Sequence, residues 1–259
     1  MTTNSEKQEF ASLCVQNGFR RQGSTFSRCI GDGIYQNISI AGSDYVCHDS
    51  PAYSPTRRKS TCIEFGFWSM YADLPEYYFQ AVDRPHVVSF SPEHMVGIRY
   101  SMQTFMGFAH QCEIMRTVGF PMLNSVTTQQ SLLDVTYRLQ RAECGKVLMP
   151  QSSFLCAPLY LSGDREAAEN QLACLYAYNW LGFHITNDHL KEEGQTENYL
   201  HLEQQCQSDM QSVTTLLRLM VGKREQEILE HFHAALERNV NAARRNGIPF
   251  CNGFGTESC

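Results

Sequence analysis

The residues that could carry metal chemistry are histidines close to a carboxylate. His184 and Asp188 are four residues apart, a spacing that puts two side chains on one face of a helix. The polar run at 186–188, however, is typical of the end of a helix rather than its interior. His231 and His233 are two residues apart, so on a helix they would lie on different faces. We therefore expect no metal ion and no cofactor.

Nucleophilic and phosphate chemistry have sequence signatures that this chain lacks. It contains no Gly-x-Ser-x-Gly and no glycine-rich loop ending in Gly-Lys-Ser/Thr. Gly31-Asp32-Gly33 lacks the third glycine of a dinucleotide-binding loop. With eleven cysteines and nine histidines, a Cys–His pair could still be assembled by the fold, since such partners need not be neighbours in sequence. A hydrolase-like enzyme with such a site is the alternative function.

The cysteines themselves indicate a reducing compartment. Their number is odd, they are spread over the chain, and no two form Cys-x-x-Cys. Disulfide frameworks serve mainly small secreted domains, whereas a chain of 259 residues can bury a sizeable core without them. The polar N-terminal sequence also lacks the apolar core of a secretory signal. We therefore expect reduced, mostly buried thiols in a cytoplasmic protein.

Two groups of residues could form a binding surface. The segment from Phe65 to Phe79 is dense in aromatic residues, and exposed Trp68 and Tyr71 side chains would be typical of a binding hot spot. Arg20, Arg21 and Arg28, together with the Arg57-Arg58-Lys59 run, could form a positive patch that attracts an acidic protein partner. The alternatives are that the aromatic residues fill the core and that the basic residues belong to a solvated, ion-paired surface.

Composition argues against two classes of partner. The chain has 21 Lys and Arg against 27 Asp and Glu, a net charge of −6. That charge disfavours nucleic-acid binding, which depends on neutralising phosphates with basic residues. No apolar run approaches the ~20 residues that span a membrane. We therefore expect neither nucleic acid nor membrane as a partner.

The first hundred residues predict a helix followed by a sheet. Apolar residues at helical intervals before Gly18 predict a helix that this glycine ends. Residues 24–30 and 34–40 flank Gly31-Asp32-Gly33 and predict a β-hairpin. Residues 42–60 are rich in glycine, proline, serine and aspartate and predict a long loop.

Residues 61–71 predict an interior strand, because both of its faces are apolar. Ile63, Phe65 and Phe67 share one face, and Trp68 and Met70 share the other. A turn of helix is predicted at 74–79, and short strands are predicted at 86–90 and 94–100. Since no crossover helix separates the strands, we expect an antiparallel sheet of four or five members.

After Ser101 the apolar period becomes helical. The first helix is predicted to stop at Gly119 and Pro121, and a capping-box spacing at Thr127 and Gln130 precedes the second. Further predictions are helices from near 164, over 199–221 and over 223–246, and a surface segment at 188–198. The predicted class is α+β, with a sheet-forming part at 1–100, a helical part at 101–246 packed on or beside it, and an irregular tail at 247–259.

The N-terminal sequence resembles that of a known bacterial family. Phe10-x-x-Leu13, followed by Gly18-Phe19-Arg20-Arg21-Gln22-Gly23, is similar to the family called domain of unknown function 4304. In that family a helix ends in Gly-Phe, a basic turn follows, and an aromatic strand pairs with a second strand. The resemblance covers about the first seventy residues. It implies a bacterial protein and carries over no catalytic residue.

These observations favour a binding role. Because recognisable enzyme motifs are absent while the fold signals are strong, we expect a non-catalytic interaction protein, of an accessory or toxin-neutralising kind. No catalytic residue is assigned. The candidate binding residues are Trp68, Tyr71, Arg20, Arg28, Arg57 and Arg58.

Overall fold

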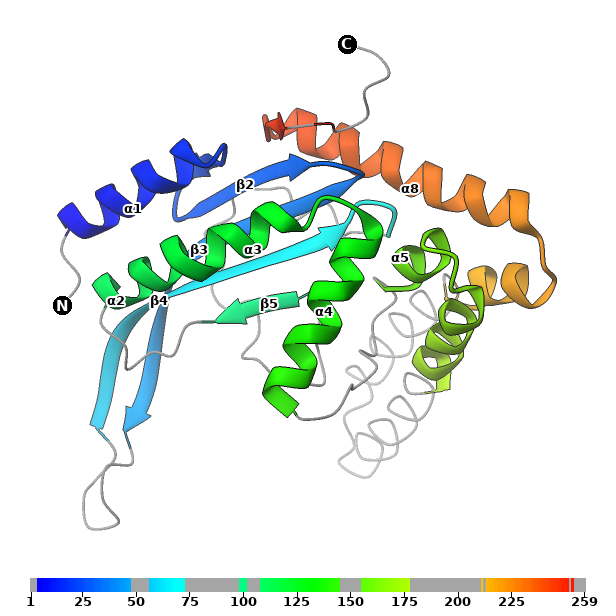
Figure 1. Ribbon diagram of the computed structural model, residues 1–259, viewed down its shortest axis with the longest axis horizontal. Coiled ribbons are helices and arrows are strands. Elements are labelled where there is room, and N and C mark those ends of the chain that lie inside the picture. The colour runs from blue at the N-terminus through cyan, green and yellow to red at the C-terminus, as the bar shows by residue number, and fades with distance from the viewer. Residues whose placement is uncertain are drawn as a thin grey trace, which may run out of the picture.

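The chain forms one mixed sheet with helices packed against it (Figure 1). The computed structural model describes residues 4–47, 56–72, 98–101, 108–144, 155–177, 211, 213–251 and 253. The strands are β1 (Arg20–Gln22), β2 (Thr25–Ile30), β3 (Ile34–Cys47), β4 (Thr56–Ser69), β5 (Ile98–Ser101) and β6 (Phe250–Cys251). β1 to β5 pair antiparallel in sequence order. The predicted α+β class, with an antiparallel sheet of four or five strands, is confirmed.

The N-terminal helix and hairpin form where the sequence predicts them. α1 (Asn4–Gln16) ends just before Gly18, whose φ of +80° is the left-handed conformation that stops a helix. β2 and β3 are joined through Gly31 and Gly33, with φ of +57° and +62°. Only glycine adopts such values without steric cost, which explains the tight turn.

The prediction of a long loop at 42–60 is wrong for most of its length. β3 continues to Cys47 and β4 begins at Thr56, and the two strands keep one register from Ile34↔Ser69 to Cys47↔Thr56. Residues 48–55 lie outside the described part. Glycine and serine are poor strand formers by propensity, but continuous pairing with a neighbouring strand overrides that weak preference.

β4 is an interior strand with both faces buried, as predicted. It lies between β3 and β5. Ile63 and Phe67 belong to the main core, whereas Trp68 and Met70 belong to a second cluster on the other face. Of the strand predicted at 94–100, β5 contains the last three residues. The described residues do not include 74–79, 86–90, 94–97 or 188–198.

One continuous helical segment replaces the helix end predicted at Gly119 and Pro121. α2 (Phe108–Ile114) passes into a π-helical turn, η3 (Met115–Gly119), and then into α3 (Phe120–Ser125). A proline ring collides with the carbonyl four residues earlier in a regular α-helix. The wider π turn precedes Pro121 and places this proline in the first turn of α3, where no N–H donor is required. The prediction of a stop is therefore wrong.

A reciprocal cap precedes α4, and further helices follow it along the chain. α4 (Gln129–Cys144) begins after Thr128, one residue later than the predicted pair implies. Ser131 N–H donates to Thr128 Oγ1 at 3.1 Å, and Thr128 N–H donates to Ser131 Oγ at 2.9 Å. The other described helical segments are α5 (Cys156–Leu161), 165–177, 213–221 and α8 (Glu225–Arg245).

The C-terminal tail, predicted to be irregular, contributes a strand. β6 pairs parallel with β2 through Cys29↔Phe250 and Ile30↔Cys251. Cys29 N–H also donates to the Pro249 carbonyl at 2.8 Å. The two paired segments are separated by most of the chain, so no local pattern could predict this pairing.

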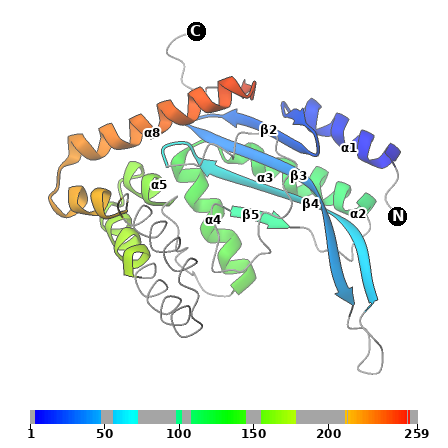
Figure 2. The same ribbon diagram turned by 180° about the vertical axis from the view of Figure 1, so that it is seen from behind.

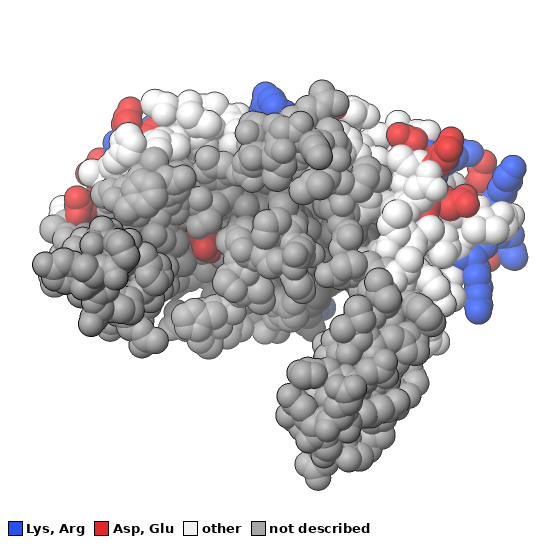
Figure 3. All heavy atoms as spheres, turned by 90° about the horizontal axis from the view of Figure 1, so that it is seen from below, with Lys and Arg blue, Asp and Glu red and all other residues white. Residues whose placement is uncertain are grey.

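The described surface carries charges of both signs. Arg165 pairs with Glu225, and Arg224 pairs with Glu227, all four side chains being exposed. Figure 3 shows described acidic and basic side chains interspersed on one face of the molecule. No helix within the described ranges is long and apolar enough to cross a membrane.

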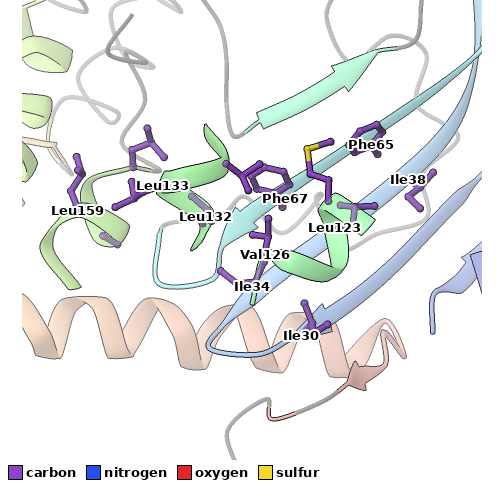
Figure 4. Close-up of a cluster of buried hydrophobic side chains, with 14 of the residues drawn as sticks. Ile30, Ile34, Ile38, Phe65, Phe67, Leu123, Val126, Leu132, Leu133 and Leu159 are labelled. Atoms are coloured by element: carbon purple, nitrogen blue, oxygen red, sulfur yellow. The ribbon is translucent and has the colours of Figure 1, made fainter. Parts of the chain in front are cut away.

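The main core lies between the sheet and the helices that cover it. Figures 1 and 2 show α2, α3 and α4 across one face of the sheet, and α8 running past the end where β2 turns into β3. Figure 4 shows Phe67 of β4, Leu123 of α3 and Leu132 of α4 directed into this space. The arrangement leaves the opposite end of β3 and β4 beyond the core.

Candidate interaction site

β3 and β4 continue beyond the rest of the sheet as a two-stranded arm. β2 pairs with β3 only as far as Ser39, and β5 pairs with β4 only from Glu64 onward. Eight further β3–β4 pairs follow, from Ile40↔Ile63 to Cys47↔Thr56. We call residues 40–47 and 56–63 the β-arm. Figures 1 and 2 both show it projecting from the body of the molecule.

Gln111 of α2 holds the base of the β-arm. Its buried side-chain Oε1 accepts a hydrogen bond from Ile63 N–H at 2.7 Å, and its Nε2 donates to the Thr61 carbonyl at 3.0 Å. One amide side chain thus makes the two backbone hydrogen bonds that a neighbouring strand would make. Nothing in the sequence pointed to this residue, because a glutamine inside a helical pattern carries no signal for such a contact.

The β-arm carries positive charge on an acidic chain. Its residues include three Lys and Arg and one Asp, a net charge of +2. The rest of the chain contains 18 Lys and Arg and 26 Asp and Glu, a net charge of −8. The three basic residues are consecutive on β4 and stand opposite residues of β3 in the pairs Arg57↔Val46, Arg58↔Tyr45 and Lys59↔Asp44.

The four arginines among the candidate binding residues do not form one patch. Arg28 of β2 pairs with Gln36 of β3. Arg57 of β4 pairs with Val46, ten residues further along β3. At ~3.3 Å per residue, this separates the two backbones by about 33 Å. Arg20 lies on β1 and donates to the carbonyl oxygen of Gly247. Only Arg57 and Arg58 belong to the β-arm.

Arg28 is a buried structural residue, with 4% of its surface exposed. Its guanidinium donates to Gln36 Oε1 at 2.8 Å, to the Asn17 carbonyl at 2.5 Å and to Asn124 Oδ1 at 2.6 Å. The Phe19 ring centroid lies 4.2 Å from its Cζ atom. Burial lowers the pKa of Arg28, although an arginine stays charged at physiological pH. Uncharged oxygen acceptors and an aromatic ring therefore stabilise the buried guanidinium. Through these contacts Arg28 links the end of α1, the sheet and α3.

Trp68 and Tyr71 lie away from the β-arm and differ in exposure. Trp68 is 5% exposed and packs on Tyr35, with ring centroids 5.6 Å apart, so it fills the core. Tyr71 is half-buried, and its hydroxyl donates to Asp32 Oδ1 at 2.9 Å. Burial and the Asp32 carboxylate raise the pKa of Tyr71, so the hydroxyl remains a donor. The His233 ring stands edge-on to it at 5.9 Å.

The buried cysteines are poorly suited to nucleophilic catalysis. Burial raises the pKa of the Cys14, Cys29 and Cys156 thiols, and it raises the pKa of Cys112 to about 11. A protonated thiol is a weak nucleophile, so these four positions disfavour the alternative of a Cys/His hydrolase. Within the ranges that the structure covers, no three His, Cys, Asp or Glu side chains gather as metal ligands.

The comparisons with known proteins found no similar protein. No family model, no curated protein and no solved structure matches the chain. The resemblance of the N-terminal segment to domain of unknown function 4304 therefore stays a prediction. The geometry alone singles out the β-arm, with its buried Gln111 anchor and its basic run, as the candidate interaction site.

Proposed function

We propose that the protein is a non-catalytic interaction protein whose β-arm binds an acidic surface of a partner protein. The observation that carries the proposal is the eight-pair extension of β3 and β4 beyond the sheet, with Arg57-Arg58-Lys59 on it. A two-stranded ribbon alone is marginally stable in water, so stabilisation of the body does not account for its length. Positive charge on an otherwise acidic chain attracts an acidic partner to this element and orients it there.

The proposal extends to the setting of this role. In this proposal, the chain is an accessory or toxin-neutralising protein of a bacterium, which covers a surface of its partner without turnover. We propose a cytoplasmic role, because the six cysteines whose side chains the structure describes are free thiols, which suits a reducing compartment. The net charge of −6 disfavours nucleic acid as the acidic partner.

Charge reversal on the β-arm tests the proposal. The full-length protein is used to capture partners from an extract of its source organism, and the captured protein is then purified and titrated against wild type and Arg57→Glu/Arg58→Glu. We expect the double variant to bind at least about 10-fold more weakly, since like charges then face each other. Binding of the wild type should also weaken as salt is raised from about 0.05 to 0.3 M.

A matched variant separates the β-arm from net charge. Arg138→Glu/Arg218→Glu makes the same charge change at exposed positions of α4 and the 213–221 helix. It should bind the purified partner like wild type. Equal weakening by both double variants, or full binding by the β-arm variant, would contradict the proposal.

A further inference from the structure

The backbone of β4 has a defined direction along the β-arm. Gln111 bonds to the carbonyl of Thr61 and the N–H of Ile63, so the backbone groups of these odd-numbered residues point away from β3. In an antiparallel strand, the backbone N–H and C=O groups of successive residues are directed alternately toward one neighbouring strand and the other. The β3–β4 register has no bulge, so the N–H and C=O groups of Lys59 and Arg57 are also directed away from β3. Among the described residues, no strand pairs with them on that side.

Within the part of the chain that the structure describes, this edge is covered only at and inward of the base of the β-arm. β5 covers β4 from Glu64, and the Gln111 amide covers Thr61 and Ile63. From Lys59 outward, the N–H and C=O groups of the edge are a template for another strand. Basic residues on an edge strand prevent pairing with a second copy of the same basic strand, but they favour an acidic one.

We propose that the β4 edge at Arg57 and Lys59 takes up an extended acidic segment of the partner as an additional strand. This inference rests on the proposed function and specifies the form of the partner. The N–H and C=O of these two residues provide four backbone hydrogen bonds, and the adjacent basic run selects for glutamate or aspartate. Gln111 sets the inner limit of the pairing, because it already occupies the edge at Thr61 and Ile63.

Amide hydrogen exchange tests the direction and the occupancy of this edge. In the free protein, the amides of Arg57 and Lys59 should exchange faster than that of Arg58, which points toward β3. The probe is an N-acetylated ten-residue peptide of alternating glutamate and valine. At saturation it should slow exchange at Arg57 and Lys59 by at least about 10-fold, as strand pairing requires. No binding, or protection that leaves out these two amides, would overturn the inference.

Proline substitution isolates the backbone N–H from the charge. Lys59→Pro removes the outward N–H, whereas Lys59→Gln removes the same charge and keeps that N–H. We expect Lys59→Pro to bind the peptide about 10-fold more weakly than Lys59→Gln, the loss of one or two hydrogen bonds. Val46→Pro places a proline on the opposite edge of the β-arm and should bind normally.

The outcomes separate this inference from the proposed function. Circular dichroism and the urea midpoint confirm that each proline variant is folded. If Lys59→Pro and Lys59→Gln bind equally well, strand addition is wrong. If Arg57→Glu/Arg58→Glu still weakens binding of the natural partner in that case, the proposed function stands without it. If that variant has no effect on the natural partner, the proposed function itself fails.

Discussion

Because several thiols are buried, we expect the stability of this protein to decrease at alkaline pH. Burial raises the pKa of Cys14, Cys29 and Cys156 above the ordinary thiol value of about 8.5. Above that pH the unfolded chain releases protons that the folded protein retains. Since the unfolded state then binds fewer protons, the free energy of unfolding falls as pH rises. The stabilisation is complete below about pH 8.5 and is progressively lost above it.

We expect substitution of one buried cysteine to reduce this dependence. Between about pH 9 and 10.5, the unfolding free energy of wild type should fall by up to about 1.4 kcal/mol per pH unit for each buried thiol. Cys29→Ala should lower the slope by that amount, whereas Val15→Ala, which removes no titratable group and lies at an exposed position, should leave it unchanged. Urea unfolding curves across this range measure both slopes. Identical slopes in the two variants would show that the buried thiol does not retain its proton.

At the residue scale, burial of apolar side chains was predictable from the sequence, but polar partnerships were not. Ile63 and Trp68 were predicted on opposite faces of one strand, and they are buried in two different clusters. Arginine is usually exposed, so Arg28 was predicted on the surface. The acceptors that allow its burial come from three separate segments, and Gln111 likewise meets its partners only through the packing of α2 on β4.

At the scale of elements, the β2–β3 turn docks on the start of α4. Asp32 N–H donates to the Thr127 carbonyl at 2.7 Å. A Cβ atom on Gly31 would overlap that carbonyl group, whereas one on Gly23 would meet no atom within 4 Å. The two glycines have nearly the same φ, +57° and +61°, so an alanine suffers similar backbone strain at either position.

This matched pair predicts how much the docking contributes. Gly23→Ala should destabilise the protein by about 1 kcal/mol, the strain of a left-handed alanine. Gly31→Ala should lose at least about 2 kcal/mol more, because the turn must move away from Thr127 to relieve the overlap. Urea denaturation of both variants gives the difference. Equal destabilisation would mean that the turn moves freely and that its contact with α4 contributes little.

Element types were predicted well, but two boundaries were not, and both failures have a tertiary cause. The loop predicted at 42–60 has the composition of a loop, yet β3 and β4 extend into it by pairing with each other. The stop predicted at Pro121 is valid for a regular α-helix, and a π turn removes the collision. The β-arm was therefore invisible as an element, although its basic run was a candidate from the sequence.

At the scale of the whole molecule, one core joins the two predicted parts of the chain. The main cluster includes Phe65 from the sheet-forming part, and Leu123 and Phe232 from the helical part. Neither part can therefore bury its apolar face without the other. A domain with a single continuous core is expected to unfold in one cooperative transition.

A truncation in the helical part should thus weaken the sheet equally. Leu123→Ala removes a fully buried side chain and should lower the free energy of unfolding by about 3 kcal/mol, whereas Val221→Ala, 63% exposed, should change it little. Far-ultraviolet circular dichroism follows the helices, and fluorescence in a Trp180→Phe background, where Trp68 is the single tryptophan, follows the second cluster on the opposite face of the sheet. In Leu123→Ala, both signals should shift to the same lower urea midpoint. A fluorescence midpoint that stays at the wild-type value would show that the sheet folds independently of the helices.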